Sequence, residues 1–301
     1  MTLEQLRLFL AVAEREHVTA AARTLGVTQS AVSAAIAALE QRHGVRLFDR
    51  VGRGIVLSAA GHAFLPEARA VLAQAAAAEH ALDDLSGLAR GSLRVVASQT
   101  IAAYWLPPLL TAYRSRYPGI ALDVGIDNTQ AAAALVHAGE ADLGFVEGMV
   151  DNPALEQWTV GEDRLVLVGH TPFGVASIDP DWLRRARWIV REAGSGTRSA
   201  LDARLRGLGI DPSLLDIALV LPANESVRTA VESGAGIAAL SALVVAPSLA
   251  AGTLHAAPMT FAARPFFALR HKDRYMSHAA QALSALLAGP TDAATRADRS
   301  A

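Results

Sequence analysis

The sequence contains no cysteine, which excludes disulfide bonds, thiolate metal sites and cysteine nucleophiles. Such a composition needs no oxidising compartment, and we expect a cytoplasmic protein. Charged residues make up only 19% of the chain and hydrophobic residues 52%, a balance typical of a folded globular protein rather than a disordered one. With 301 residues, the chain is long enough for about two domains, each with its own core.

Segments that would export the chain or hold it in a membrane are also missing. Glu4 and Arg7 interrupt the only apolar stretch near the N-terminus, so we expect no signal peptide. An uncharged run from Gly234 to Leu254 is long enough to raise the question of a membrane span, but Gly236 and Pro247 break it up. We interpret this run as a buried strand followed by a short helix, and we expect no membrane partner.

The formal net charge of −2 gives no indication of a nucleic-acid-binding protein, because such proteins are usually basic. Residues 1–58, however, carry seven arginines against five acidic residues. Four of the arginines lie close together: Arg42, Arg46, Arg50 and Arg53. This local basic patch is of the kind that contacts phosphate, although a solvated helix end would have a similar composition.

Hydrophobic spacing and capping residues predict three short helices near the N-terminus. Thr19 is a candidate cap for the second helix, which Gly26 would end. Thr28 is the candidate cap of the third helix, which would end at Gly44. The three helices are predicted over residues 3–14, 20–25 and 29–43. Because so short a glycine turn separates the last two, they form a helix-turn-helix.

A small hairpin and a long helix follow. Two short apolar runs, residues 45–48 and 55–57, flank a Gly-Arg-Gly tip, which predicts a β-hairpin of the kind called a wing. Ser58 then caps an alanine-rich helix that extends to about Ser86 and would be about 40 Å long. Pro66 lies within it and removes a backbone donor, so it should kink the helix or fray its first turns.

Apolar residues of this long helix repeat at alternating spacings of four and three. The members are Phe64, Ala68, Val71, Ala75, Ala78, Leu82 and Leu85. This spacing is a heptad seam, and an exposed seam needs a partner helix. A helix that faces a core would show a similar stripe, but a linker of this length has no core of its own. We therefore expect the helix to dimerise.

Beyond Gly91 the pattern changes to alternating short strands and helices, which predicts parallel sheets with crossover helices. Strands are expected at residues 93–97, 120–126, 143–146, 165–169, 188–191, 219–221, 237–240 and 266–270. Helices are expected at residues 101–117, 131–137, 199–208, 226–233 and 277–287. The residues after Gly289 are expected to form a disordered tail.

These motifs resemble the LysR-type transcriptional regulators over nearly the whole chain. The matching residues are Leu6, Phe9, Val12, Ala13, Thr19, Ala21, Ala22, Leu25, Val27 to Ser33, Ile36, Leu39, Glu40, Gly44, Leu47, Phe48, Arg50, Arg53, Gly54 and Leu57 to Gly61. The resemblance implies a C-terminal domain similar to type 2 periplasmic binding proteins, with two α/β lobes, crossing strands and a ligand cleft between the lobes. It also implies a homodimer or homotetramer that binds double-stranded DNA.

The expected multidomain architecture is therefore an all-α winged helix-turn-helix domain, a long linker helix and a two-lobed α/β domain. We assign residues 1–58 to DNA binding, 59–89 to the linker and dimerisation helix, and 90–301 to an effector-binding regulatory domain. Within the regulatory domain, the first lobe would hold residues of about 90–162 and 266–289, and the second about 163–265.

The DNA-binding residues follow from the third helix, because the N-terminus of a recognition helix enters the major groove. Glutamine can pair with two atoms of adenine, whereas serine discriminates less. The same residue types are common as caps in the first turn of any helix. Arginines of the wing can contact phosphate or enter the minor groove. The candidates are Thr28, Gln29, Ser30, Ser33, Arg50 and Arg53. Ala37 and Ala38 stand where relatives often carry basic or polar residues, so we expect no phosphate contacts there.

The effector site is expected where helix N-termini of both lobes face the cleft, because free N–H groups and positive dipole ends attract anions. Each candidate alone would be an ordinary loop or cap residue. The candidates are Ser98, Gln99, Thr100, Thr129, Ser195, Gly196, Thr197, Arg198, Asn224 and Glu225. The Arg191-Glu192-Ala193 lead into Gly194 is similar to the family branch that controls carbon-fixation and sulfur-assimilation genes. This similarity implies a small anionic effector such as an oxyanion, a carboxylate or a phosphorylated metabolite.

Catalytic motifs are missing from the sequence. It has no H-E-x-x-H motif and no P-loop, and its nine histidines show no metal-ligand spacing, so we expect neither an enzyme nor a cofactor or metal. Residues 234–239 have the spacing G-x-G-x-x-A of a dinucleotide fingerprint, but they follow a predicted helix and enter an apolar run, which is the wrong context. Two alternatives remain: a solute-binding protein and a metabolite-binding enzyme with an appended DNA-binding domain.

Overall fold

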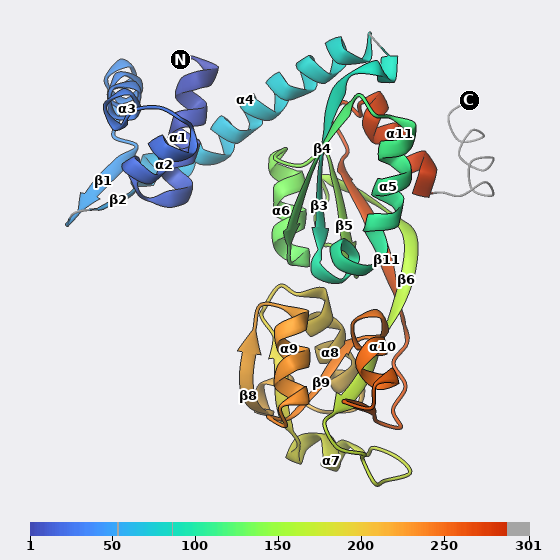
Figure 1. Ribbon diagram of the computed structural model, residues 1–301. Helices are drawn as coiled ribbons and strands as arrows, with labels where there is room; N and C mark the ends of the chain where they lie inside the picture. Colours follow the sequence, from blue (N-terminus) through green and yellow to red (C-terminus); the bar gives the residue numbers. More distant parts are fainter. Residues whose placement is uncertain (53, 86, 288–301) are drawn as a thin grey trace. The chain divides into compact units, whose positions relative to one another are not determined.

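The computed structural model describes residues 1–52, 54–85 and 87–287 (Figure 1). The described residues form two units: those within 1–85 together with 138–140, and those within 87–137 together with 141–287. The first unit contains α1 (Leu3–Arg15), α2 (Val18–Thr24), α3 (Gln29–His43), β1 (Phe48–Val51), β2 (Gly54–Leu57) and α4 (Ala59–Asp84). The three predicted N-terminal helices and the hairpin are thus confirmed. Arg53, one of the predicted DNA-binding residues, lies outside the described residues.

The caps of these helices follow the sequence with one exception. Thr28 accepts from the Ala31 amide at 3.2 Å and Gly44 ends α3 in the left-handed region, as predicted. The prediction that Thr19 caps α2 is wrong. His17 is the cap, since its Nδ1 accepts from the Ala20 amide at 3.3 Å. Thr19 lies inside the first turn, where its hydroxyl instead donates to Gln29 at 3.0 Å.

Helix α4 is continuous from Ala59 to Asp84, so the predicted fraying of its first turns at Pro66 is wrong. Ser58 caps the helix by accepting from the Gly61 amide at 3.0 Å. Phe64 and Ala68 pack into the core of the first unit, which anchors the turns on either side of the proline. The Phe64 ring lies 5.1 Å from that of Phe9 between ring centroids.

The predicted seam of α4 therefore divides into two parts. Its first members lie in the core of the first unit, as Phe64 and Ala68 show. Farther along, Val71 is 40% exposed, Leu82 68% and Leu85 84%. The exposed part of the seam is thus the apolar surface of α4 that a partner helix could cover.

The second unit is built on a nine-stranded sheet with the order β4-β3-β5-β11-β6-β9-β7-β8, and β10 pairs with β6. The strands are β3 (Gly91–Ser98), β4 (Ile120–Asp127), β5 (Leu143–Glu147), β6 (Leu155–Gly169), β7 (Arg187–Arg191), β8 (Asp216–Leu221), β9 (Ile237–Ser241), β10 (His255–Ala256) and β11 (Ala263–His271). The helices are a π-helical segment (Ile101–Trp105), α5 (Leu106–Arg116), α6 (Thr129–Ala138), α7 (Pro180–Arg185), α8 (Gly196–Gly207), α9 (Asn224–Glu232), α10 (Ala242–Ala250) and α11 (His278–Leu287), with 3-10 turns at Gly87–Ala89 and Pro212–Leu214.

Strands β6 and β11 divide this sheet into two lobes. In the first lobe, β3 pairs in parallel with β4 and β5. In the second lobe, β7 pairs in parallel with β8 and β9. Strand β6 pairs with β11 over Leu155–Arg164 and then with β9 over Leu165–Gly169, so it crosses from one lobe to the other. Two lobes with crossing strands are the architecture that the resemblance implied.

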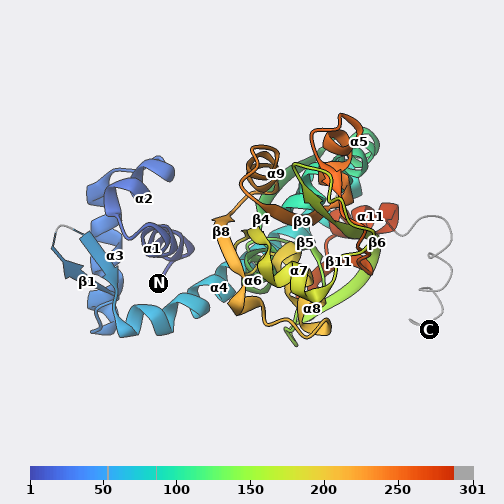
Figure 2. The ribbon, with the colours of Figure 1, turned by 90° about the horizontal axis from the view of Figure 1, so that it is seen from below.

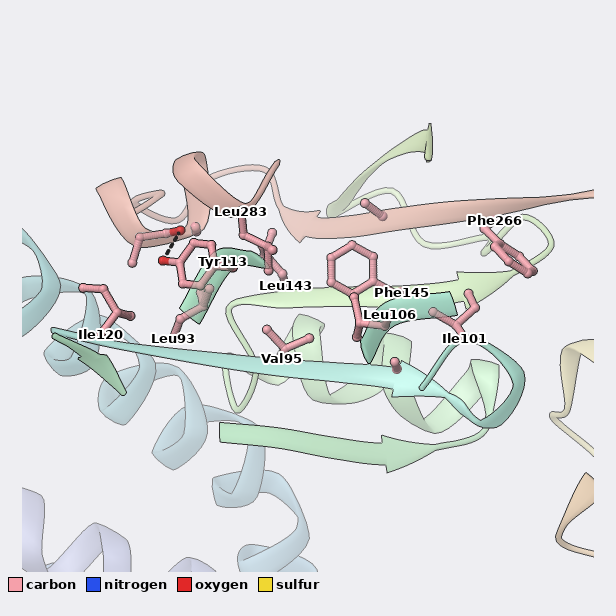
Figure 3. Packing of buried hydrophobic residues seen from close by; sticks show 14 residues of the cluster. Leu93, Val95, Ile101, Leu106, Tyr113, Ile120, Leu143, Phe145, Phe266 and Leu283 are labelled. Atoms are coloured by element: carbon pink, nitrogen blue, oxygen red, sulfur yellow. Dashed lines mark hydrogen bonds between the residues drawn. The ribbon is translucent and has the colours of Figure 1, made fainter. Parts of the chain in front are cut away.

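The core of the first lobe is closed by helices on its sheet (Figure 3). Leu93, Val95 and Phe145 of the sheet pack against α5 and α11. The Tyr113 hydroxyl of α5 donates to the Ala279 carbonyl of α11 at 3.0 Å, and burial raises the pKa of this tyrosine to about 12. Such a packed core holds the ends of β3 and β5 in fixed positions.

Candidate functional site

Helix α3 presents one buried and one exposed face. Val32, Ile36 and Leu39 are buried in the core of the first unit. The predicted residues Thr28, Gln29, Ser30 and Ser33 are exposed. The Thr28 and Ser30 hydroxyls lie 3.0 Å apart. The start of α3 therefore presents exposed polar side chains to a partner, and Thr28 caps the helix there.

A hollow of about 340 Å³ lies beside this turn, between α2, α3 and the hairpin. Its lining is Glu16, His17, Val18, Thr19, Gln29, Ser33, Arg50, Gly52, Gly54 and Ile55. Figure 2 shows α2, α3 and β1 as neighbours within the first unit. The structure thus brings Gln29 and Ser33 of α3 together with Arg50 of the hairpin around one concave surface.

The base of the hairpin is fixed by two side chains. Glu40 of α3 accepts from the Leu47 amide at 2.7 Å and from the Phe48 amide at 3.3 Å. Ser58 donates to the Arg46 carbonyl at 2.6 Å and caps α4 at the same time. Glu40 therefore ties the hairpin, and with it Arg50, to α3, and Ser58 ties it to α4.

In the second unit, polar residues at the strand ends join the two lobes. We call this region the interlobe junction: residues 98–100, 128–130 and 147 of the first lobe, residues 191–198 and 222–225 of the second, and Asp163 and Arg264 of the crossing strands. The Gln99 amide group donates to the Pro222 carbonyl at 3.0 Å and accepts from the Asn224 amide at 2.9 Å. The Gln130 amide donates to the Gly194 carbonyl at 3.1 Å. The lobes therefore meet through specific polar contacts.

Arg191 is buried at the centre of one part of the junction. It donates to Glu192 through Nε at 2.8 Å and Nη2 at 2.9 Å, and through Nη1 to the Asn224 side chain. Asn224 in turn donates to Thr100 at 3.1 Å. Burial is the largest single influence on Glu192 and raises its pKa. Hydrogen bonds from Arg191, from the backbone and from Asn128, together with the positive charge of Arg191, outweigh burial, so the net pKa is lowered. Glu192 therefore stays ionised and balances the charge of Arg191.

Arg264 of β11 forms a second buried group. Its Nη2 donates to Asp163 at 2.7 Å, and its Nη1 donates to Thr197 at 3.2 Å. Glu147, at the end of β5, lies 3.9 Å from the same Nη2 and 3.4 Å from the Thr129 hydroxyl. These contacts place Thr129 of the first lobe and Thr197 of the second around one arginine and two carboxylates.

The remaining predicted residues have other partners. Arg198 pairs with Asp202 one turn along α8 at 2.8 Å, so it has a structural partner of its own. Glu225 accepts from Tyr104 at 3.1 Å, and burial, followed by the charge of Glu225, raises the pKa of that tyrosine. Ser195 is buried at the start of α8. A Cβ built on Gly196 would lie 2.7 Å from both the Glu147 carbonyl and the Thr129 hydroxyl, so only glycine allows this approach.

The charged junction residues that were not selected from the sequence as effector candidates are Glu147, Asp163, Arg191, Glu192 and Arg264. Asp163 and Arg264 lie in strands, and in a strand sequence a charged residue that becomes buried cannot be distinguished from one that stays at the surface. Glu147 did leave a signal, because it directly follows the apolar run Leu143–Val146 at the carboxyl end of a parallel strand.

Two other kinds of site, a membrane span and a metal site, are not found within the described ranges 1–52, 54–85 and 87–287. No helix there has both the length and the apolar character to cross a membrane. Nor do those residues include a group of three or more histidine and carboxylate side chains arranged to hold a metal ion.

Residues 3–62 match the family described as "Bacterial regulatory helix-turn-helix protein, lysR family", and residues 86–289 match "LysR substrate binding domain". Over 260 residues, 84% of this chain and 80% of the relative, the chain is 35% identical to the "Probable RuBisCO transcriptional regulator" of Cyanophora paradoxa. Full-length CbnR complexed with its target DNA is similar in fold, with a TM-score of 0.66 at 24% identity over 95% of this chain and 99% of that one. The regulatory domain of CcmR from Synechocystis PCC6803, in complex with 2-PG, gives a TM-score of 0.60 at 24% identity over 67% and 99%.

A winged helix-turn-helix, a long helix and a two-lobed α/β domain along one chain define a ligand-responsive transcriptional regulator. The chain belongs to the LysR family of transcriptional regulators. The resemblance and the multidomain fold class expected from the sequence are thereby confirmed.

Proposed function

We propose that this regulator reads operator DNA with the first turn of α3. Thr28, Gln29, Ser30 and Ser33 would face base edges in the major groove. Arg50 of β1, together with Arg53, would neutralise phosphates. The observation that carries this proposal is the hollow in which Gln29, Ser33 and Arg50 meet on one exposed surface. Base contacts from α3 would give specificity, and phosphate contacts would give most of the affinity.

Replacing Gln29 with alanine is expected to relax specificity at one base pair in each half-site. A bidentate glutamine contact to adenine contributes about 1–3 kcal/mol of discrimination, which corresponds to roughly 5–150-fold. Binding to an operator series with each base pair changed in turn, followed by fluorescence anisotropy, measures the loss. The matched control is Gln41→Ala, because Gln41 is also exposed but lies near the other end of α3. Equal specificity profiles for Gln29→Ala and the unchanged protein would contradict the assignment.

We further propose that a small anionic effector binds at the interlobe junction and controls DNA binding. The first turns of α6, α8 and α9 all contribute to the junction through Thr129, Gly196 and Asn224, and helix N-termini favour negative charge. The buried guanidinium groups of Arg191 and Arg264 lie in the same region. CcmR, whose regulatory domain binds 2-PG, offers a fold-level parallel. Effector binding would change the contacts between the lobes and so their relative angle.

We propose that the chain works as a homodimer or homotetramer in which the exposed seam of α4 contacts a second copy. Introducing Val71→Asp and Leu82→Asp together is expected to convert the oligomer to smaller species, because two charges would be buried in an apolar helix pair. Sedimentation velocity measures the change. Gln74→Asp, an exposed position on α4 outside the seam, is the control. A cooperative dimer footprint on DNA from the double variant would show that α4 is not the dimer contact.

We also propose that the protein acts in the cytoplasm and catalyses no reaction. Recovery of an unchanged effector after prolonged incubation with the protein tests the absence of catalysis. The domain boundaries proposed from the sequence, 1–58, 59–89 and 90–301, are supported by the start of α4 at Ala59 and of β3 at Gly91.

A further inference from the structure

Glu147 is a buried carboxylate that lacks a close hydrogen-bond donor. Its side chain is 3% exposed. Within the described part of the chain, the Thr129 hydroxyl lies 3.4 Å from this carboxylate and Arg264 Nη2 lies 3.9 Å from it. Good hydrogen bonds to a carboxylate are 2.5–2.9 Å long, so both contacts are weak. A buried carboxylate in this condition is costly unless another group donates to it.

The charges of the junction single out the same residue. Arg191 is balanced by Glu192 through two hydrogen bonds, and Arg264 is balanced by Asp163 at 2.7 Å. Of the two buried carboxylates, Asp163 and Glu147, Asp163 has a cation at hydrogen-bond distance, whereas the Arg264 guanidinium lies 3.9 Å from Glu147. An anion without a hydrogen-bond donor would be repelled by the Glu147 carboxylate, because an ionised carboxylate can only accept hydrogen bonds.

Two buried atoms of the junction lack a hydrogen-bond partner among the residues that the structure describes: the Ser98 hydroxyl and Arg264 Nε. Both can donate a hydrogen bond. Ser98 ends β3, whose neighbour β5 ends in Glu147, and the ladder pairs Ala97 with Phe145. The junction thus combines buried donors that lack a partner with a carboxylate whose hydrogen bond from Thr129 is long, at 3.4 Å. This combination suits a ligand that has both donors and acceptors.

We infer that the effector is an anion that also carries a hydrogen-bond donor, such as an acid proton, a hydroxyl or an ammonium group, and that Glu147 accepts this donor. The inference rests on the proposed function, because it names the class of anion that the interlobe junction takes. The anionic group of the effector is bound by Arg264, Ser98 and the first turn of α8. Glu147 selects against anions that have no hydrogen-bond donor. Glu147 is therefore a specificity-determining residue.

Inorganic phosphate and sulfate are the probes that separate these cases, because both are tetrahedral oxyanions but only phosphate retains a proton near neutral pH. Calorimetric titration of the full chain is expected to show phosphate binding about tenfold or more tighter than sulfate, since a buried acceptor left without a donor is penalised to that extent. In the Glu147→Gln variant, the side-chain amide can donate a hydrogen bond as well as accept one, whereas an ionised carboxylate can only accept. The preference of this variant for phosphate over sulfate is expected to disappear or to reverse in favour of sulfate.

Two controls make the result specific. Glu162→Gln changes an exposed carboxylate on β6 and is expected to leave both affinities unchanged. Thr197→Ala, at the junction, is expected to weaken phosphate and sulfate by a similar factor, because Thr197 contacts the guanidinium of Arg264 rather than Glu147. Thermal melting of each variant confirms that it is folded.

The outcomes distinguish the two proposals. Equal binding of phosphate and sulfate to the unchanged protein, or an undiminished phosphate preference in Glu147→Gln, would overturn the role of Glu147 and leave the anion site standing. Binding of neither ion, or binding that Thr197→Ala does not alter, would overturn the anion site itself and the inference with it.

Discussion

Replacing Gly61 with alanine is expected to destabilise the first unit by about 1–3 kcal/mol or more and to abolish DNA binding. A Cβ built on Gly61 would lie 2.1 Å from the Leu47 carbonyl oxygen and 2.8 Å from Leu57 Cδ2. The Leu47 backbone cannot move aside freely, because its amide donates to Glu40 at 2.7 Å and its carbonyl accepts from the Ser58 amide at 2.9 Å. The added methyl group must therefore separate α4 from the base of the hairpin.

Hydrogen exchange of the α1 and α3 amides measures this effect locally. Tryptophan fluorescence provides an internal reference, because all four tryptophans lie in the second unit, at positions 105, 158, 182 and 188. Gly207→Ala is the matched control: it is also helical, and a Cβ there would meet nothing within 4 Å. We expect it to be neutral or slightly stabilising. Unchanged exchange in Gly61→Ala would show that the close approach is not required.

Replacing Arg264 with methionine is expected to lower the free energy of unfolding of the second unit by about 3–5 kcal/mol. Arg264 is 6% exposed and contacts Asp163 of β6 and Thr197 of α8. Removing the guanidinium leaves Asp163 and the nearby Glu147 as buried carboxylates without a cation. Methionine fills most of the space, so the loss is mainly electrostatic rather than a cavity effect.

Urea unfolding followed by tryptophan fluorescence measures this loss. Arg270→Met is the control on the same strand, since Arg270 pairs with Glu156 at 2.6 Å in a partly exposed position. An exposed pair of this kind contributes about 0–1 kcal/mol. If both variants lost the same small amount of unfolding free energy, the charged residues of the junction would have to be solvated, contrary to their burial.

Local signals in the sequence predicted the fold well where one residue type determines the backbone. Thr28 and Gly44 marked both ends of α3, and Ser58 marked the start of α4, because capping needs only neighbouring residues. The cap of α2 was missed because it is a histidine, an uncommon cap. The first half of β6, Leu155–Arg164, was missed because its polar residues, such as Glu156 and Glu162, obscure the strand pattern.

The two sites differed in how far sequence could predict them. The residues proposed to read DNA bases lie at the start of one helix, so the exposure of Gln29, Ser30 and Ser33 follows from the helical period. The junction is assembled from residues distant in sequence, and the pairing of Arg264 with Asp163 spans 101 positions. A one-dimensional pattern cannot show which charged residues become buried together. Arg198, singled out for its position after a glycine-rich turn, instead pairs along its own helix.

Selection from a pool of random DNA duplexes tests the central claim, that the chain reads specific DNA through paired copies of α3. We predict enrichment of a sequence with two related half-sites whose centres lie one helical turn, about 10 base pairs, or a multiple of it apart. Recovery of sequences with no common motif, bound with no more affinity than the starting pool, would contradict the account.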